Sequence, residues 1–164
     1  MPAKLDIIRS YGPVPETDAE AVKAAGELIN GAERPLVLVG QGVELGNAQQ
    51  ELRAFIEKAD MPAGCTLLGL SALPTEHPLN KGMLGMHGNP GPNMNTNKCD
   101  VLIAVGMRFD YRLTGNQVTY AKQAHVLHFD NDPAEINMYE HAELAVLGHC
   151  EVTISVAMAL LHPT

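Results

Sequence analysis

Short apolar runs that alternate with helix-like segments constrain the fold of this chain more than any other feature of its sequence. The clearest run, Val101-Leu102-Ile103-Ala104-Val105, is apolar at every position and has the length of a strand. Such runs are apolar on both faces, which is typical of a parallel sheet covered by helices on each side. The other runs span residues 36–39, 61–66, 125–130 and 144–148. We therefore predict a three-layer α/β fold, with a mainly parallel sheet of about five or six strands and helices on both faces.

The segments between these runs carry helix signals. Thr17-Asp18-Ala19-Glu20 resembles a capping box with Thr17 as the cap, and the helix it opens should end near Gly31. Asn47 is expected to cap a second helix, and Pro133 to open another. Residues 74–97 show neither period and are predicted to form a loop. The residues expected to face the core are Val22, Ala25, Leu28 and Ile29 in the first helix, Leu52, Phe55 and Ile56 in the second, and Val152, Val156, Ala159 and Leu160 in the last.

Composition and charge argue against several classes of function. Lys and Arg number 11 against 19 Asp and Glu, and this net charge of −8 disfavours nucleic acid and anionic membrane surfaces as partners. No apolar run approaches the roughly 20 residues of a membrane span, and no signal-peptide core is present. The cysteines Cys65, Cys99 and Cys150 lie far apart, which favours a reducing compartment and a cytoplasmic location. No spacing typical of a metal site appears, and His125 and His128 are interpreted as one outward and one inward strand residue.

Glycines and polar residues follow the apolar runs directly. In an open parallel sheet, ligands bind beyond the carboxyl ends of the strands, so these residues should meet at one edge of the sheet. Gly40 and Gly42, which flank Gln41 after the first run, can offer backbone N–H groups without side-chain obstruction. Thr66 and Leu67 follow the second run in the same way.

Charged residues follow the later runs. Arg108 and Arg112 can meet a pyrophosphate through forked hydrogen bonds. The alternative is that they form surface salt bridges with Asp110 or Asp132. Asp130 ends a run and can accept hydrogen bonds from ribose hydroxyls, and its alternative role is to cap a helix ahead of Pro133.

The stretch Gly82-Met83-Leu84-Gly85-Met86-His87-Gly88 is rich in glycine and methionine. Glycines let a backbone approach a flat or charged ligand closely, and methionines can fit the face of an apolar ring. The alternative interpretation is an ordinary Gly-rich surface turn.

Four motifs follow one another in the chain: Gly40-Gln41-Gly42, the stretch 82–88, Gly106-Met107-Arg108-Phe109-Asp110-Tyr111-Arg112-Leu113-Thr114-Gly115, and His128-Phe129-Asp130-Asn131-Asp132-Pro133-Ala134-Glu135-Ile136. In this order they resemble the central domain of the large catalytic subunit of acetolactate synthase, a thiamine-diphosphate enzyme. The resemblance runs from about residue 34 to about residue 161. It implies a Rossmann-like, DHS-like domain that holds FAD structurally, without a redox role in the synthase reaction.

The resemblance also implies where FAD would bind, with no catalytic residue and no metal ligand in this chain. Two departures from the family's pattern bear on the site: Tyr111 replaces a usual Asp, and His149 stands where the family commonly has Asp. The implied flavin contacts are Thr66, Leu67, Leu84, Gly85, Met86, His87 and Gly88. The implied ribityl and pyrophosphate contacts are Gly106, Arg108, Asp110 and Arg112, and the implied ribose contacts are Asp130 and Asn131. Gly40, Gln41 and Gly42 complete the predicted cofactor-binding set.

The resemblance covers only the middle of a whole synthase. In the family, an N-terminal glutamate activates thiamine diphosphate, and a C-terminal domain with a Gly-Asp-Gly motif holds it with magnesium. This chain contains no Gly-Asp pair. We therefore expect residues 17–164 to be the central cofactor-binding domain and residues 1–16 an interdomain linker. The expected partners are the N- and C-terminal domains of the same protein, in a parent homo-oligomer that can carry a regulatory subunit.

The parent would condense pyruvate with pyruvate or 2-oxobutyrate in branched-chain amino-acid biosynthesis, and this chain alone would not. Binding of FAD by the chain alone is expected to be weak, because the loop 74–97 would have to be ordered on binding. Two other functions stay open. One is the middle domain of another thiamine-diphosphate enzyme, such as oxalyl-CoA decarboxylase, pyruvate oxidase or glyoxylate carboligase. The other is a freestanding nucleotide-binding or interaction module.

Overall fold

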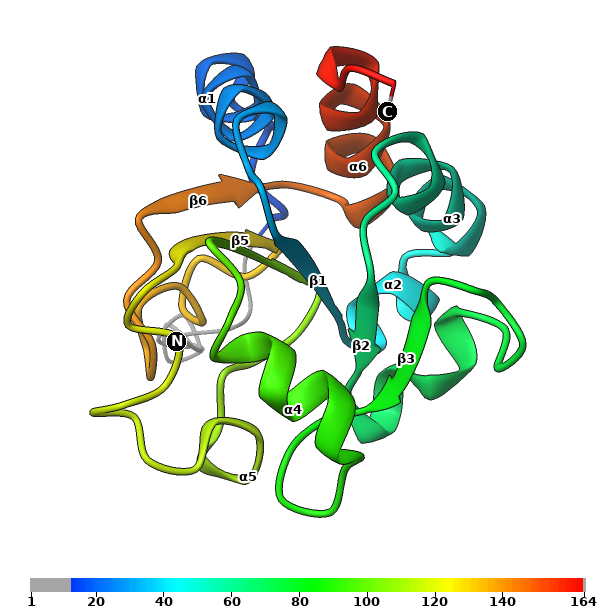
Figure 1. Ribbon diagram of the computed structural model, residues 1–164. Coiled ribbons are helices and arrows are strands. Elements are labelled where there is room, and N and C mark those ends of the chain that lie inside the picture. The colour runs from blue at the N-terminus through cyan, green and yellow to red at the C-terminus, as the bar shows by residue number, and fades with distance from the viewer. Residues whose placement is uncertain (1–12, 164) are drawn as a thin grey trace, which may run out of the picture.

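The computed structural model describes residues 13–163 and shows a six-stranded sheet with helices packed on it (Figure 1). The strands lie in the order β3-β2-β1-β4-β5-β6, and every pair of neighbours is parallel, so the predicted α/β fold is confirmed. Most of the predicted linker lies outside the described residues. The strands are β1 Pro35–Val39, β2 Ala63–Cys65, β3 Asn80–Met83, β4 Val101–Val105, β5 His125–Asp130 and β6 Leu144–Leu147. The helices are α1 Ala19–Asn30, α2 Gln41–Leu45, α3 Gln49–Lys58, α4 Pro90–Thr96, α5 Tyr111–Thr114 and α6 Cys150–Leu160, with the 3-10 helix η1 at Leu67–Ala72.

Alternation of side chains along the strands divides the core into two layers. In β1, Val37 and Val39 pack with the buried faces of α1, α3 and α6. Leu36 and Leu38 point to the opposite side, where they pack with Phe109 and other residues of the segments that follow β3 and β4. Figure 1 shows α1, α3 and α6 on one side of the sheet and α4 on the other. The apolar central strands β1 and β4 are therefore buried on both faces, as their sequences predict.

The order of the strands determines where a ligand can bind. β1 pairs with β2 on one side and with β4 on the other. The chain builds the sheet outward from β1 to β3, then returns to β4 and builds toward β6. This reversal leaves a crevice beyond the carboxyl ends of β1 and β4, the usual ligand position in doubly wound sheets.

Two predicted helix caps are wrong. Asp18, rather than Thr17, caps α1, and its Oδ1 accepts a hydrogen bond from the backbone N–H of Glu20 at 2.9 Å. Asn47 lies in the left-handed region with a φ of 51°, in the tight turn between α2 and α3. The cap position of α3 is occupied by Ala48 instead. The short helix α2 has no signal in the sequence, and Asn47 lies in the turn that ends it.

The face of α6 was also predicted wrongly. The predicted core residues Val152, Val156, Ala159 and Leu160 are exposed. The helix instead buries Cys150, Thr153, Ile154 and Ala157, because it packs against α1 and α3 along that side. Apolar residues occur on both sides of this helix, so its sequence period alone does not determine the buried face.

The segments around residues 80 and 133 differ from prediction as well. The predicted loop 74–97 contains β3 and α4. Residues 80–83 lie at the edge of the sheet and include no β-branched residue, which removes the usual strand signal. Residues 133–137 form turns rather than a helix. These turns follow the side-chain acceptors Asp130 and Asp132, which bond to the backbone N–H groups of Asp132 and Ala134.

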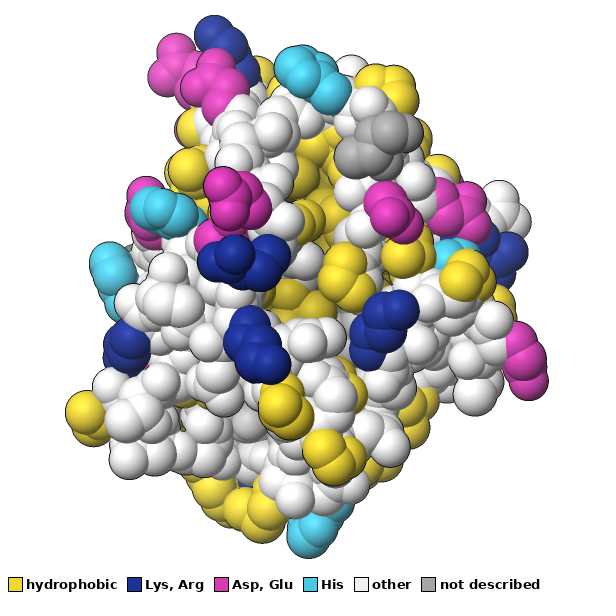
Figure 2. Space-filling view, in the orientation of Figure 1, with side chains coloured by type: hydrophobic (Ala, Val, Ile, Leu, Met, Phe, Trp, Pro, Cys, Tyr) yellow, Lys and Arg dark blue, Asp and Glu magenta, His cyan; other side chains and the backbone are white. Residues whose placement is uncertain are grey.

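The surface carries no dominant charged patch on the side seen in Figure 2. Charged side chains are scattered over this side, and hydrophobic side chains are visible between the helices in its upper part. Among the described residues, none of the helices combines the length and the apolar character that a membrane crossing requires.

Candidate functional site

A groove with a volume of about 1080 Å³ lies at the carboxyl ends of the strands. Segments that follow all six strands contribute to its lining, with β1 and β4 at its centre. Gly85 and Gly88 belong to the predicted set but are not among the lining residues. The predicted residues that do line the groove are Gly40, Gln41, Gly42, Thr66, Leu67, Leu84, Met86, His87, Gly106, Arg108, Asp110, Arg112, Asp130 and Asn131.

Close packing of two turns forms the floor of the groove. The N–H of Gly40 donates to the carbonyl of Val105 at 3.0 Å, and the N–H of Gly42 donates to the carbonyl of Gly106 at 2.8 Å. A Cβ on Gly42 would lie 2.7 Å from the Cα of Gly106, whose φ is +56°. The expectation that the N–H groups of Gly40 and Gly42 are available to a ligand is therefore wrong. They join the turn after β1 to the turn after β4.

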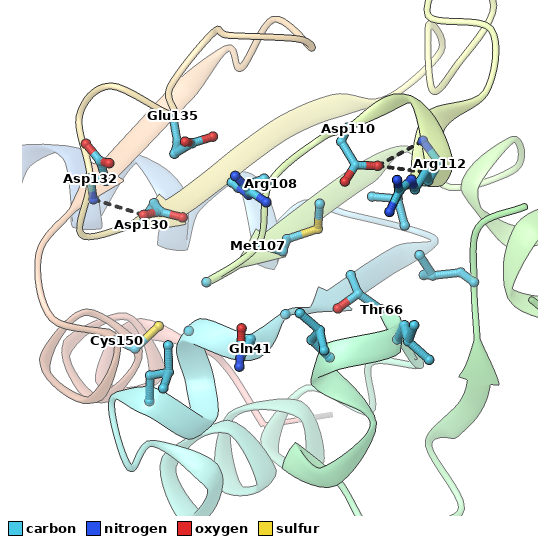
Figure 3. Close-up of a pocket in the computed structure, with 18 of the residues that line it drawn as sticks. Gln41, Thr66, Met107, Arg108, Asp110, Arg112, Asp130, Asp132, Glu135 and Cys150 are labelled. Atoms are coloured by element: carbon cyan, nitrogen blue, oxygen red, sulfur yellow. Dashed lines mark hydrogen bonds between the residues drawn. The ribbon is translucent and has the colours of Figure 1, made fainter. Parts of the chain in front are cut away.

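Arg108 lies in the middle of the groove, between Asp130 on one side and Arg112 on the other (Figure 3). Among the described residues its guanidinium forms no hydrogen bond and no ion pair, so the alternative of salt bridges with Asp110 or Asp132 is not observed. Asp110 caps α5 instead, and its Oδ1 accepts from the N–H of Arg112 at 2.8 Å. An unpaired guanidinium is therefore available to an anionic ligand.

Arg112 has an aromatic neighbour at the same part of the groove. Its Nε lies 3.4 Å from the hydroxyl of Tyr111, and its guanidinium carbon lies 5.7 Å from the centroid of the Tyr111 ring. The hydrogen bond with Tyr111 raises the pKa of Arg112 above its usual value. Tyr111 thus gives Arg112 a neighbour that does not neutralise its charge.

Carboxylates gather at one end of the groove, which we call the acidic end: Asp130, Asp132 and Glu135. Asp130 is only 8% exposed, and its Oδ1 accepts from the N–H of Asp132 at 2.9 Å. Its Oδ2 lies 3.6 Å from Nε2 of His128. The acidic end therefore offers hydrogen-bond acceptors to a ligand with hydroxyl groups.

His128 of β5 lies next to Asp130 and is hydrogen-bonded to the segment after β4 that carries Arg108. It is 1% exposed, and its Nε2 lies 2.8 Å from the carbonyl of Met107. Because a carbonyl only accepts, Nε2 carries the hydrogen. The ring also packs edge-on against Phe109, at 5.3 Å between centroids. His125, in contrast, is exposed, so the predicted outward and inward pair is confirmed.

The opposite end of the groove, which we call the apolar end, consists of Leu67, Leu68 and Met86. These side chains are 69%, 60% and 65% exposed although they are apolar. Leu84 also lines the groove and is buried. Exposed apolar side chains that border one groove are typical of a site for a flat apolar group.

Several lining residues were not in the predicted binding set. Most lie one or two positions from a predicted residue, so the extent of each motif was underestimated. Leu45 and Gly46 carry no sequence signal, because they enter the groove only through α2. Cys150, another of these lining residues, is buried, and its burial together with the charge of Asp130 raises the pKa of its thiol to about 12. The additional lining residues are Leu45, Gly46, Leu68, Met83, Met107, Tyr111, Leu113, Asp132, Glu135, His149 and Cys150.

Comparison with known protein families identifies the domain. The family model for the central domain of thiamine pyrophosphate enzymes matches residues 22–156. The chain belongs to this family. The resemblance found in the sequence motifs is thereby confirmed at the level of the family.

The relatives of this central domain include large subunits of acetolactate synthase. It is 45% identical over 127 residues to the isozyme 2 large subunit of Escherichia coli (strain K12), covering 77% of this chain and 23% of the relative. It is 45% identical over 145 residues to the large subunit of Parasynechococcus marenigrum (strain WH8102), covering 88% of this chain and 23% of the relative. The chain thus spans about a quarter of the length of these curated relatives.

A solved structure shares the fold. An enzyme from Mycobacterium smegmatis assigned as thiamin diphosphate-dependent superposes with a TM-score of 0.79 at 22% sequence identity. The match covers 97% of this chain and 31% of that chain.

Proposed function

We propose that this central domain holds FAD in the groove at the carboxyl ends of its strands, as part of an acetolactate synthase. The observation that carries the proposal is the unpaired guanidinium of Arg108 between the apolar end and the acidic end of one groove. The acetolactate synthase relatives favour this enzyme over other members of the thiamine-diphosphate class.

The three parts of the groove match the chemistry of the three parts of FAD. The apolar end suits a flat isoalloxazine ring. Arg108 and Arg112 suit the pyrophosphate, because guanidinium groups form forked hydrogen bonds with phosphate oxygens. The acidic end suits ribose hydroxyls, which donate to carboxylates. The volume of about 1080 Å³ lies slightly above the usual range of about 300–1,000 Å³ for small-molecule sites, which suits an extended dinucleotide.

In the proposed role FAD supplies a flat ring and a charged scaffold that complete the fold of the site, rather than a redox step. The residues of this chain bind and orient it. Arg108 neutralises the pyrophosphate charge, and Asp130 fixes the ribose from a nearly buried position.

We further propose that the parent protein places this domain between N- and C-terminal domains that bind thiamine diphosphate and magnesium. The parent would condense pyruvate with pyruvate or 2-oxobutyrate, as a homo-oligomer that can carry a regulatory subunit. The names of the relatives support this assignment. The 164-residue chain itself is proposed to bind the cofactor without catalysing the condensation.

Titration of the purified chain with FAD, followed by flavin fluorescence, tests the binding role. We expect saturable binding at one FAD per chain. Changing Arg108 to Ala should raise the dissociation constant about 10- to 100-fold, because it removes the unpaired cation from the groove. Arg53→Ala is the matched control, because Arg53 is an exposed arginine of α3 outside the groove. Absence of binding to the wild-type chain, or equal affinity of the Arg108→Ala variant, would contradict the proposal.

A further inference from the structure

The loop 83–88, which carries Met86 of the apolar end, is hydrogen-bonded to the side chain of Asn93 in α4. The Oδ1 of Asn93 accepts a hydrogen bond from the N–H of Gly85 at 2.8 Å. The Nδ2 of Asn93 donates to the carbonyl of Gly85 at 2.9 Å. The carboxamide of Asn93 thus bonds to both the backbone N–H and the backbone carbonyl of Gly85. Gly85 has a φ of +101°, a backbone conformation that favours glycine, so any other residue at this position would strain the loop.

The same loop is joined to the part of the groove that carries the arginines. The N–H of Met86 donates to the carbonyl of Arg112 at 2.8 Å. A Cβ on Gly85 would lie only 3.0 Å from that carbonyl oxygen, so the two segments are in close contact. Through Gly85, Asn93 is therefore linked both to the loop 83–88 and to the segment that carries Arg112. Asn93 is not itself among the residues that line the groove.

Other contacts of the loop also lie within this chain. The N–H of Leu84 donates to the carbonyl of Cys65 in β2 at 3.0 Å, and the N–H of Gly88 closes the turn onto the carbonyl of Gly85 at 3.0 Å. From the sequence, the loop is expected to become ordered only when a ligand binds. These contacts reduce that ordering cost, because the backbone is already hydrogen-bonded in one conformation.

We propose that Asn93 is a positioning residue that holds residues 83–88 in the shape that binds the ligand, so that the groove is preformed by this domain alone. The predicted effect of Asn93 on FAD binding rests on the proposed function. Its predicted effect on the conformation of the loop does not, and amide exchange measures that effect separately.

Three variants of the full 164-residue chain test the proposal. Asn93→Ala removes both hydrogen bonds. Asn93→Asp keeps the shape and the Oδ1 acceptor but replaces the donor with an oxygen that faces the carbonyl of Gly85. Asn95→Ala is the matched control on the same helix, because the Asn95 side chain makes no hydrogen bond among the described residues. Amide hydrogen exchange by NMR reports on the loop, and FAD titration reports on the site.

In Asn93→Ala and Asn93→Asp, we expect exchange at Gly85 to accelerate about tenfold or more, because Ala removes the acceptor of its N–H and the Asp carboxylate repels the Gly85 carbonyl. Exchange at Met86 should accelerate with it, because the loop that places the Met86 N–H against the Arg112 carbonyl is then no longer held. Exchange in β4 should stay at the wild-type rate, which separates positioning from a general loss of stability. The FAD dissociation constant should rise about tenfold in both variants and remain unchanged in Asn95→Ala.

Unchanged exchange at Gly85 in both Asn93 variants would overturn the proposal. Faster exchange with wild-type FAD affinity would also overturn it, because the loop would then not limit binding. If the wild-type chain binds no FAD, the proposed function fails, while exchange at Gly85 still decides whether Asn93 holds the loop.

Discussion

At the scale of single residues, hydrogen-bond partners determine which groups are available to a ligand. Arg108 and Asp130 could be placed at the site from the sequence, because each follows a strand-length apolar run and parallel strands end at one edge of the sheet. The N–H groups of Gly40 and Gly42 could not be assigned in this way. Their acceptors are the carbonyls of Val105, the last residue of β4, and of Gly106, and only the packing of two distant segments brings donors and acceptors together.

His128 is a buried residue whose single donor can be tested directly. Changing His128 to Leu removes the donor and leaves the Met107 carbonyl unpaired in a buried position, which should cost about 1–3 kcal/mol of the free energy of unfolding. His128→Gln places an amide donor near the position of Nε2 and should retain more of the stability. Urea denaturation of the three proteins measures this order, and equal losses in both variants would assign the effect to packing against Phe109 instead.

At the scale of elements, the sequence predicts an element well when one period dominates it. The runs of β1 and β4 are apolar throughout, and each forms a strand that is buried at nearly every position. The runs predicted at β5 and β6 also form strands, of which β6 is only partly buried. β3 was missed because it is an edge strand of Asn80-Lys81-Gly82-Met83, which contacts only one neighbour and carries no strand-forming pattern. The face of α6 was missed because apolar residues occupy both sides of the helix, and packing between α1 and α3 determines which side is buried.

Substitutions on the two sides of α6 distinguish the observed face from the predicted one. Ile154→Ala should destabilise the domain by about 2–4 kcal/mol, because Ile154 is fully buried between the helices. Val156→Ala, a truncation on the exposed side, should change the free energy of unfolding by less than about 0.5 kcal/mol. Chemical denaturation measures both, and a larger loss for Val156→Ala would mean that α6 packs through the face first predicted.

At the scale of the whole molecule, buried thiols make stability depend on alkaline pH. Burial raises the pKa values of Cys65 and Cys99 to about 11 and that of Cys150 to about 12, from an ordinary value of 9.0. The folded state therefore disfavours the thiolate. Its stabilising contribution is complete below pH 9 and is lost as the pH rises from 9 toward 11, since the unfolded chain releases its protons first.

We expect the free energy of unfolding to fall by roughly 1 kcal/mol per buried thiol between pH 8 and pH 10. Urea denaturation under reducing conditions at these two pH values measures the change. A Cys65→Ala variant should lose about a third of the pH dependence, and a wild-type stability that stays constant up to pH 10 would contradict the burial of the thiols.

The central claim for the whole molecule is that one preformed groove at the carboxyl ends of the strands binds FAD. Mapping amide chemical-shift changes while FAD is added to the ¹⁵N-labelled chain tests this claim most directly. The predicted result is a set of saturable changes confined to the turns after β1, β2, β4 and β5 and to the loop 83–88. Saturable changes centred instead on Arg34 and Lys98, at the smaller cavity that they line, would contradict the claim, as would no change at any amide.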